Sequence, residues 1–134
     1  KEHGVVHILI NNAAIAMGKR VDEMKPQEIK LMMDKIYKLR ASDYALPKTK
    51  IIEHRKKSPV LIVNVNSIAG HTACSRNSAY CASKYALNGF MDALRQELLN
   101  KPQIVLTNFY PWYINTGLFD GFKPLLAYIL PTLD

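Results

Sequence analysis

Residues 5–10 read Val-Val-His-Ile-Leu-Ile, a short and almost continuous apolar run in which β-branched residues predominate. Such a run is typical of a strand whose side chains are buried on both faces of a parallel sheet. The same signature returns at Val60–Val65 and at Ile104–Phe109. We therefore expect three strands, each buried on both faces.

Two helical stretches separate these strands. The first begins near Pro26, a residue suited to the first turn of a helix, and should continue to about Tyr44. The second is expected from Ser78 to Asn100, where apolar residues recur at helical spacing. This alternation is the order of successive right-handed βαβ units, so the sequence predicts the α/β class with a parallel sheet flanked by helices.

Composition limits the size of the fold and the kinds of partner. A chain of 134 residues with 49% hydrophobic content is long enough for one modest core. Much of the net charge of +7 comes from a basic run at residues 48–57, which fits the solvated end of a helix. A nucleic-acid or membrane-surface module would need interleaved aromatic residues or a recognised motif, and we expect no nucleic-acid partner.

The two cysteines and the apolar stretch at the end of the sequence do not indicate a special site. Cys74 and Cys81 lack the spacing of a disulfide framework or a metal site, so no metal is expected and a reducing compartment is the default. The apolar stretch from Gly117 to Asp134 fits core packing better than a substrate-facing lid or a membrane contact.

Tyr80 and Lys84 are four residues apart in the second helical stretch, so their side chains share one face of the helix. A nearby ammonium favours the phenolate and lowers the pKa of a tyrosine, which makes the pair suitable for acid–base chemistry. The spacing alone is weak evidence, because Tyr44 and Lys48 repeat it. Pro47 lies within that second pair and should end or kink its helix.

A serine strengthens the first pair. Ser67 lies thirteen positions before Tyr80 and directly after the strand at Val60–Val65, at the edge where open α/β sheets place their ligands. Ser67, Tyr80 and Lys84 at these distances resemble the catalytic serine, tyrosine and lysine of the short-chain dehydrogenase/reductase family. Three more stretches agree in order and spacing: Asn11-Asn12-Ala13-Ala14, Asn64-Val65-Asn66-Ser67 and Pro111-Trp112-Tyr113-Ile114-Asn115-Thr116.

The resemblance implies a Rossmann-like fold, hydride transfer with NAD or NADP, and a role for each matching residue. Ser67 would orient the substrate oxygen, Tyr80 would exchange its proton, and Lys84 would lower the pKa of Tyr80 and hold the nicotinamide ribose. Asn12, Ile114 and Thr116 would join Tyr80 and Lys84 in cofactor binding. Taken singly, Asn12 could cap a strand, Ser67 could be a turn residue and Thr116 could be a helix N-cap.

A narrower resemblance suggests a substrate. The stretches Tyr80–Phe90 and Ile114–Gly121 are similar to those of the retinol and 17β-hydroxysteroid dehydrogenases. That group implies a small lipophilic alcohol or ketone and a place on the cytoplasmic face of the endoplasmic reticulum or on lipid droplets, with the cytoplasm otherwise. The family also implies a homodimer in which the helix carrying Tyr80 pairs with its copy.

Two departures from the family pattern set a limit on these expectations. The family's Gly-rich turn, Thr-Gly-x-x-x-Gly-x-Gly, has no match among the 134 residues. We therefore interpret residues 1–134 as the C-terminal portion of a single domain whose first βαβ units are absent, and expect the isolated chain to be inactive.

The family's mid-helix asparagine is also missing, with Asp34 nearest its place. A non-catalytic relative with a binding role is the alternative hypothesis.

Overall fold

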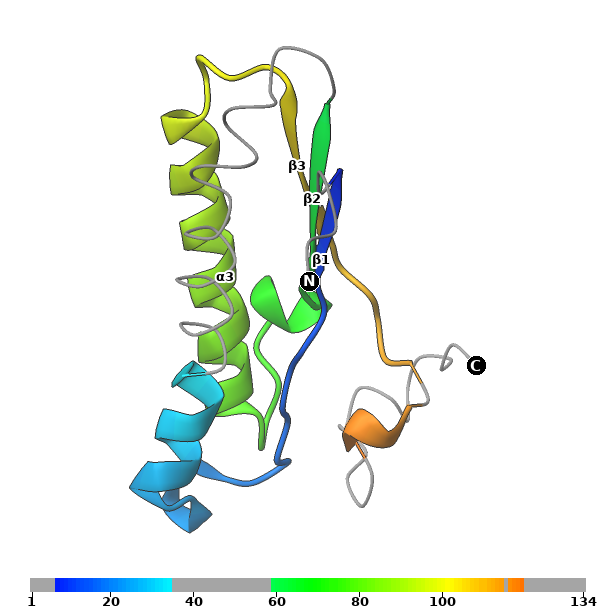
Figure 1. Ribbon diagram of the computed structural model, residues 1–134. Coiled ribbons are helices and arrows are strands. Elements are labelled where there is room, and N and C mark those ends of the chain that lie inside the picture. Colours follow the sequence, from blue (N-terminus) through cyan, green and yellow to red (C-terminus); the bar gives the residue numbers. More distant parts are fainter. Residues whose placement is uncertain (1–6, 35–58, 115, 120–134) are drawn as a thin grey trace, which may run out of the picture.

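The computed structural model describes residues 7–34, 59–114 and 116–119 of the chain. Figure 1 shows three strands beside a layer of helices. The described elements are the strands β1 (Ile8–Asn11), β2 (Val60–Val65) and β3 (Ile104–Phe109), the helix α3 (Ser78–Glu97), and the short 3₁₀ turns η1 (Val21–Glu23), η2 (Ile68–Gly70) and η3 (Gly117–Phe119). Residues 26–34 are also helical.

The three strands form one parallel sheet in the order β1-β2-β3. Ile8 is paired with Leu61, and Leu61 is paired in turn with Val105, so these three side chains share a face of the sheet. The predicted α/β class and parallel sheet are confirmed. The strand expected at residues 5–10 is described as Ile8–Asn11, and the other two strands have the predicted bounds.

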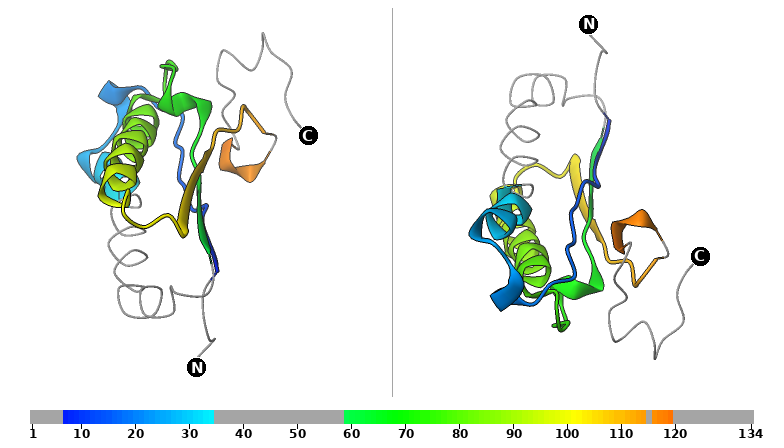
Figure 2. Two further views of the ribbon diagram at one scale, coloured as in Figure 1. Left: turned by 90° about the horizontal axis from the view of Figure 1, so that it is seen from above. Right: turned by 90° about the horizontal axis from the view of Figure 1, so that it is seen from below.

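One face of the sheet packs against the helices (Figures 1 and 2). On this face Val60 and Ile62 are buried and form a core cluster with Leu9, Ile104 and Leu106. Asn64 of the same strand is fully buried and donates a hydrogen bond to the Sδ atom of Met91 in α3. The helix layer therefore covers alternate residues of each strand.

The opposite face of the sheet corrects the expectation of strands buried on both sides. Ile8 is 59% exposed, Ile10 is 61% exposed and Phe109 is 56% exposed. Both described helical segments, α3 and residues 26–34, lie on the other side of the sheet in Figure 2. The apolar runs are real strands, but within the described residues only one of their two faces is covered.

The long helix α3 begins at Ser78 after Asn77 and ends at Glu97. The sequence predicted three further residues, to Asn100, but Leu98 has left helical geometry and Lys101 donates a backbone hydrogen bond to the Leu98 carbonyl in a turn. Pro102 follows directly and cannot continue a helix. The exposed Leu99 shows that the apolar spacing persisted beyond the buried part of the helix.

Several sequence predictions lie outside the described residues. These are the first residues of the first strand, the continuation of the helix from Pro26 to Tyr44, the Tyr44 and Lys48 pair, the basic run at 48–57, and most of the apolar stretch from Gly117 to Asp134.

Candidate active site

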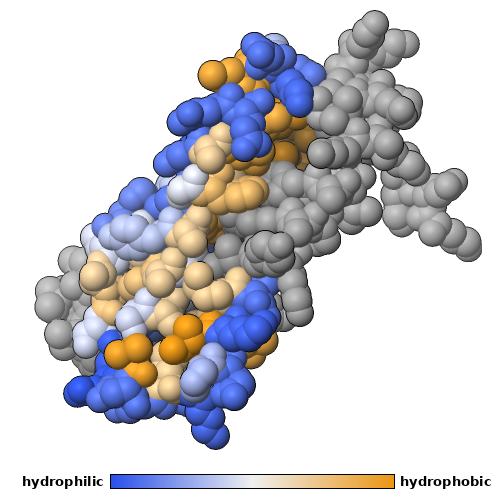
Figure 3. All heavy atoms as spheres, turned by 90° about the vertical axis from the view of Figure 1, so that its left-hand side faces the viewer, coloured by the Kyte–Doolittle hydropathy of each residue, from blue (hydrophilic) through white to orange (hydrophobic). Residues whose placement is uncertain are grey.

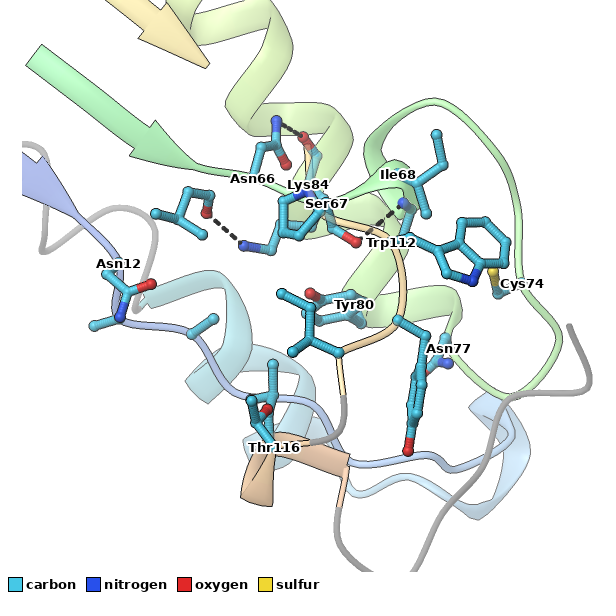
Figure 4. A pocket seen from close by; sticks show the side chains of 18 residues that line it. Asn12, Asn66, Ser67, Ile68, Cys74, Asn77, Tyr80, Lys84, Trp112 and Thr116 are labelled. Atoms are coloured by element: carbon cyan, nitrogen blue, oxygen red, sulfur yellow. Dashed lines mark hydrogen bonds between the residues drawn. The ribbon is translucent and has the colours of Figure 1, made fainter. Parts of the chain in front are cut away.

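A cavity of about 460 Å³ opens at the carboxyl edge of the sheet. Its volume lies in the range of small-molecule binding pockets. Figure 4 shows its walls: the segment after β1, the end of β2 with η2, the start of α3, and the segment after β3. All six residues proposed from the sequence line it, namely Asn12, Ser67, Tyr80, Lys84, Ile114 and Thr116.

Ser67 is held at the end of β2 by the turn that follows it. Its backbone is extended, and its Oγ atom accepts a hydrogen bond of 3.1 Å from the backbone nitrogen of Ala69. Ser67 is thus the N-cap of η2, as the turn alternative for this residue suggested. It also lines the cavity, so the capping and functional interpretations are compatible.

Tyr80 and Lys84 project from the first turns of α3. Both residues are 5% exposed. The Nζ atom of Lys84 lies 5.5 Å from the centroid of the Tyr80 ring and donates a hydrogen bond of 3.1 Å to the carbonyl oxygen of Val65. The shared helix face predicted from their spacing is therefore present, with the ammonium directed along the cavity wall toward the end of β2 (Figure 4).

Burial raises the pKa of Tyr80 above its ordinary value of 10.0. A hydrogen bond with the Ser67 side chain acts in the opposite direction, and the neighbouring thiols Cys81 and Cys74 raise the pKa further. The sequence predicted instead that Lys84 lowers this pKa. In this structure desolvation dominates, because the neutral phenol is favoured where water is excluded.

Cys74 forms another part of the cavity wall and packs against the cluster that contains Tyr80 and Cys81. Burial raises the pKa of the Cys74 thiol, as do the charge of Cys81 and a hydrogen bond with that thiol. Cys81 itself is buried in α3. Among the described residues, no group of three His, Cys, Asp or Glu side chains could hold a metal ion.

The residues proposed for cofactor binding lie on two different segments. Asn12 follows β1, whereas Ile114 and Thr116 follow β3, and the backbone nitrogen of Thr116 donates to the carbonyl of Ile114. The parallel sheet brings both segments to the same edge. The sequence alone indicates this proximity only through the expected order of the strands. Thr116 also directly precedes η3, which agrees with its alternative interpretation as a helix N-cap.

Two cavity residues were not singled out from the sequence. Asn77 is 5% exposed, and its Oδ1 atom has no hydrogen-bond partner; the same is true of Nε1 of Trp112. Trp112 belongs to the segment after β3, and Asn77 directly precedes α3. Both side chains present unused polar atoms in the neighbourhood of the cavity.

Asp34 does not line the cavity. Its carboxylate accepts a hydrogen bond of 2.6 Å from Lys30, one helical turn earlier. The structure therefore gives no support to Asp34 as a substitute for the family's mid-helix asparagine.

Comparison with known proteins assigns the family. The model of the short chain dehydrogenase family matches residues 1–124. The chain belongs to the short-chain dehydrogenase/reductase family. The match covers the stretches Asn11–Ala14 and Asn64–Ser67, the Tyr80 and Lys84 pair and the segment after β3.

Curated relatives of this dehydrogenase/reductase chain are about two and a half times its length. It is 36% identical over 118 residues to mouse dehydrogenase/reductase SDR family member 7, covering 88% of this chain and 34% of the relative. It is 33% identical over 136 residues to mouse epidermal retinol dehydrogenase 2, covering 100% of this chain and 43% of the relative. The chain thus spans less than half of each.

A solved structure confirms the Rossmann-like fold. A short-chain dehydrogenase/reductase from Burkholderia phymatum, in complex with NAD, superposes with a TM-score of 0.78 at 23% identity. The superposition covers 87% of this chain and 41% of the bacterial one.

Proposed function

We propose that this protein is an NAD(P)-dependent oxidoreductase that interconverts a lipophilic alcohol and its carbonyl compound. The observation that carries the proposal is the convergence of Ser67, Tyr80 and Lys84 on one cavity, with Asn12, Ile114 and Thr116 on its walls. These six residues come from four segments of the chain, namely the segments after β1, β2 and β3 and the helix α3. Parallel strand pairing brings the three strand ends to one edge of the sheet. Membership of the family supports the same reaction class.

The proton chemistry follows from the burial of Tyr80. Its raised pKa keeps the phenol protonated at neutral pH, which is the form that can give a proton to a carbonyl oxygen as it becomes an alkoxide. Ser67 and Tyr80 line the same cavity, and the Ser67 hydroxyl acts to lower the pKa of Tyr80, so a substrate oxygen held by both hydroxyl groups would lie in the path of that proton. Lys84 would stabilise negative charge on the phenolate that remains.

The cofactor would be NAD or NADP, which supplies the hydride and leaves the proton to the protein. The nicotinamide end fits the donor set of the cavity: the Asn12 amide, the Lys84 ammonium and the Thr116 hydroxyl. The bacterial structure is a complex with NAD. The 134 residues contain no match to the family's Gly-rich turn, so the cavity accounts for that end of the cofactor alone.

The substrate class is proposed from the cavity wall and from one relative. Apolar side chains form much of the lining, among them Val65, Ile68, Trp112 and Leu118. A wall of this kind favours a substrate with a hydrocarbon body and one reacting oxygen. The name of the mouse relative, epidermal retinol dehydrogenase 2, agrees with an alcohol of that type.

Replacement of Tyr80 by phenylalanine tests the proposal in the native protein. The Tyr80→Phe variant removes one hydroxyl group and should lower kcat for retinol- or steroid-like substrates by about 10²- to 10⁴-fold, the usual worth of a positioned acid. Tyr85→Phe is the matched control, because Tyr85 is 47% exposed on the same helix and should change kcat little. Equal activity of Tyr80→Phe and the native protein would refute the proposal.

A non-catalytic relative remains the second candidate. It is favoured by the pairing of Asp34 with Lys30 and by the lack of any asparagine between Asn12 and Asn64. Such a protein would bind a ligand in the same cavity without turning it over. In that case Tyr80→Phe would leave ligand binding unchanged, and the native protein would show no cofactor turnover.

We also propose that residues 1–134 are the C-terminal portion of one larger domain, in line with their coverage of 34% and 43% of two relatives. The purified 134-residue chain should then show no turnover of NADH or NADPH. Sequencing the transcript upstream of Lys1 gives a direct test. An in-frame Gly-rich turn would support the proposal, and a start codon immediately upstream without that turn would contradict it.

A homodimer is proposed through the outer face of α3. Ala82, Ala86, Gly89 and Ala93 are exposed along one stripe of this helix, beside the exposed rings of Tyr85 and Phe90. Figure 3 shows a band of apolar residues between hydrophilic ones on the helix layer. Small uncharged residues let two helices approach closely, so this stripe fits a helix-pairing surface.

A place at the endoplasmic reticulum or on lipid droplets is proposed from the resemblance alone. In the part of the chain that the structure describes, no helix has the length and apolar character to cross a bilayer. Fractionation of cells that express the tagged native protein tests this proposal. Recovery in the soluble fraction alone would contradict it.

A further inference from the structure

A group of hydrogen-bonded amides lies between the end of β2 and α3, next to the cavity. Asn66 follows β2 and is 2% exposed. Its Nδ2 atom donates a hydrogen bond of 2.6 Å to Oδ1 of Asn88 and a longer one of 3.4 Å to the carbonyl oxygen of Lys84. The residue directly before Ser67 is thereby tied to the helix that carries Tyr80 and Lys84.

Asn88 is the centre of this group, because its side chain has three partners on three segments. Besides accepting from Asn66, its Oδ1 atom accepts a hydrogen bond of 2.9 Å from the hydroxyl of Tyr110, which follows β3. Its Nδ2 atom donates a hydrogen bond of 2.8 Å to the carbonyl oxygen of Gly70, the last residue of η2. One amide on α3 therefore holds the segments after β2 and after β3.

The surroundings leave this group little freedom to adjust. A Cβ atom on Gly70 would lie 3.1 Å from Oδ1 of Asn66, from Nδ2 of Asn88 and from the carbonyl oxygen of Lys84. Asn66 and Gly70 are both buried. A buried amide that loses its partner costs about 1–3 kcal/mol, so the arrangement resists displacement of any one member.

The two residues tied to Asn88 lie on either side of Ser67 in the sequence. Asn66 precedes Ser67, and Gly70 ends the turn that Ser67 caps. We propose that Asn88 is a positioning residue that keeps the Ser67 hydroxyl within hydrogen-bonding reach of Tyr80. This inference rests on the proposed function. Asn88 would affect the reaction through Ser67 and would not itself contact the substrate or the cofactor. Sites of this kind depend on a shell of residues that fixes the reacting side chains.

The pKa of Tyr80 reports the position of Ser67, because the hydrogen bond between them lowers that pKa. It can be measured in the native protein by NMR titration of ¹³Cζ-labelled tyrosine, with the Tyr80 resonance assigned from Tyr80→Phe. Asn88→Leu keeps a similar volume and removes all three hydrogen bonds. It should raise the pKa of Tyr80 in the same direction as Ser67→Ala, and the double variant should show no further rise.

Two more variants complete the experiment. Gln96→Leu removes an exposed amide from the same helix and should leave the pKa of Tyr80 unchanged. Asn66→Ala removes the hydrogen bonds that Asn66 donates, while Asn88 keeps its hydrogen bonds with Tyr110 and Gly70. This variant tests the same inference if Asn88→Leu does not fold.

The outcomes separate the inference from the proposed function. An unchanged pKa of Tyr80 in a folded Asn88→Leu or Asn66→Ala variant would overturn the inference, since the amides would then serve stability alone. A raised pKa in a protein that shows no turnover would support the positioning role of Asn88 and refute the proposed reaction. A raised pKa with a fall in kcat and an unchanged KM would support both.

Discussion

The Nζ atom of Lys84 lies 5.5 Å from the centroid of the Tyr80 ring. Its hydrogen bond to the Val65 carbonyl holds it between the end of β2 and α3, so the ammonium is fixed beside the phenol. A cation in this position can stabilise the phenolate that forms once Tyr80 has given up its proton, and it can also hold a polar group of a ligand in the same cavity.

Replacement of Lys84 by methionine should therefore lower turnover by roughly 10²-fold or more, because both the charge and the hydrogen bond are lost while the alkyl stem is kept. Steady-state kinetics of the native protein measure the effect. Lys30→Met is a suitable control, since the Lys30 side chain is 72% exposed and pairs only with Asp34 among the contacts described. A Lys84→Met variant with full activity would exclude this role.

The sequence was sufficient for the strands and for the residues at the cavity because their signals are local. Three apolar runs and the spacing from Ser67 to Lys84 depend on residues close in the chain, and parallel pairing then brings the strand ends to one edge. The same local signals could not show which face of each strand is covered. The exposure of Ile8 and Ile10 depends on what packs against the sheet, which no strand pattern contains.

The amides and the pKa of Tyr80 were beyond prediction for a related reason. Asn66 and Asn88 are 22 residues apart, and nothing in their spacing indicates a hydrogen bond. The spacing of Tyr80 and Lys84 predicted a lowered pKa, but the degree of burial at that point of the helix decides the direction. Desolvation depends on how the structure packs around a side chain, whereas helical periodicity shows only which face of the helix the side chain occupies.

The raised pKa of Tyr80 predicts a loss of stability in alkali. The folded protein holds the phenolic proton above pH 10.0, where the unfolded chain releases it. The contribution of this group to the free energy of unfolding is thus fully present below pH 10.0 and is lost as the pH rises through the folded-state pKa. Urea denaturation over this pH range should show a smaller alkaline loss in Tyr80→Phe than in the native protein.

Glycines 70 and 89 should respond in opposite ways to replacement by alanine. A Cβ atom on Gly70 meets three atoms at 3.1 Å, whereas one on Gly89 meets nothing within 4 Å. Gly70→Ala should destabilise the fold by about 1–3 kcal/mol through overpacking. Gly89→Ala should stabilise it by about 1 kcal/mol, because alanine favours the helix. Denaturant midpoints measure both, and equal changes in the two variants would contradict the packing described around Asn88.

Cys74 should react slowly with alkylating reagents at neutral pH. Burial and the adjacent Cys81 thiol raise its pKa above 9.0, so little of the nucleophilic thiolate is present. The rate of carboxamidomethylation, measured by mass spectrometry, should be lower than that of an exposed cysteine in a peptide and should rise with pH. A ligand in the cavity should slow it further, because Cys74 lines the wall. A rate equal to that of the peptide at pH 7 would be inconsistent with this environment.

The outer stripe of α3 offers a test of the proposed homodimer. Ala86 is exposed at the middle of that stripe, between Ala82 and Gly89. In a dimer that pairs α3 with its copy, Ala86→Arg would bring two like charges and two long side chains into close contact, so light scattering after size exclusion should give half the native mass. Val21→Arg places the same charge on the exposed turn η1 and should leave the mass unchanged. If Ala86→Arg kept the native dimer mass, the subunits would have to pair through another surface, and the outer stripe of α3 would be excluded as the pairing surface.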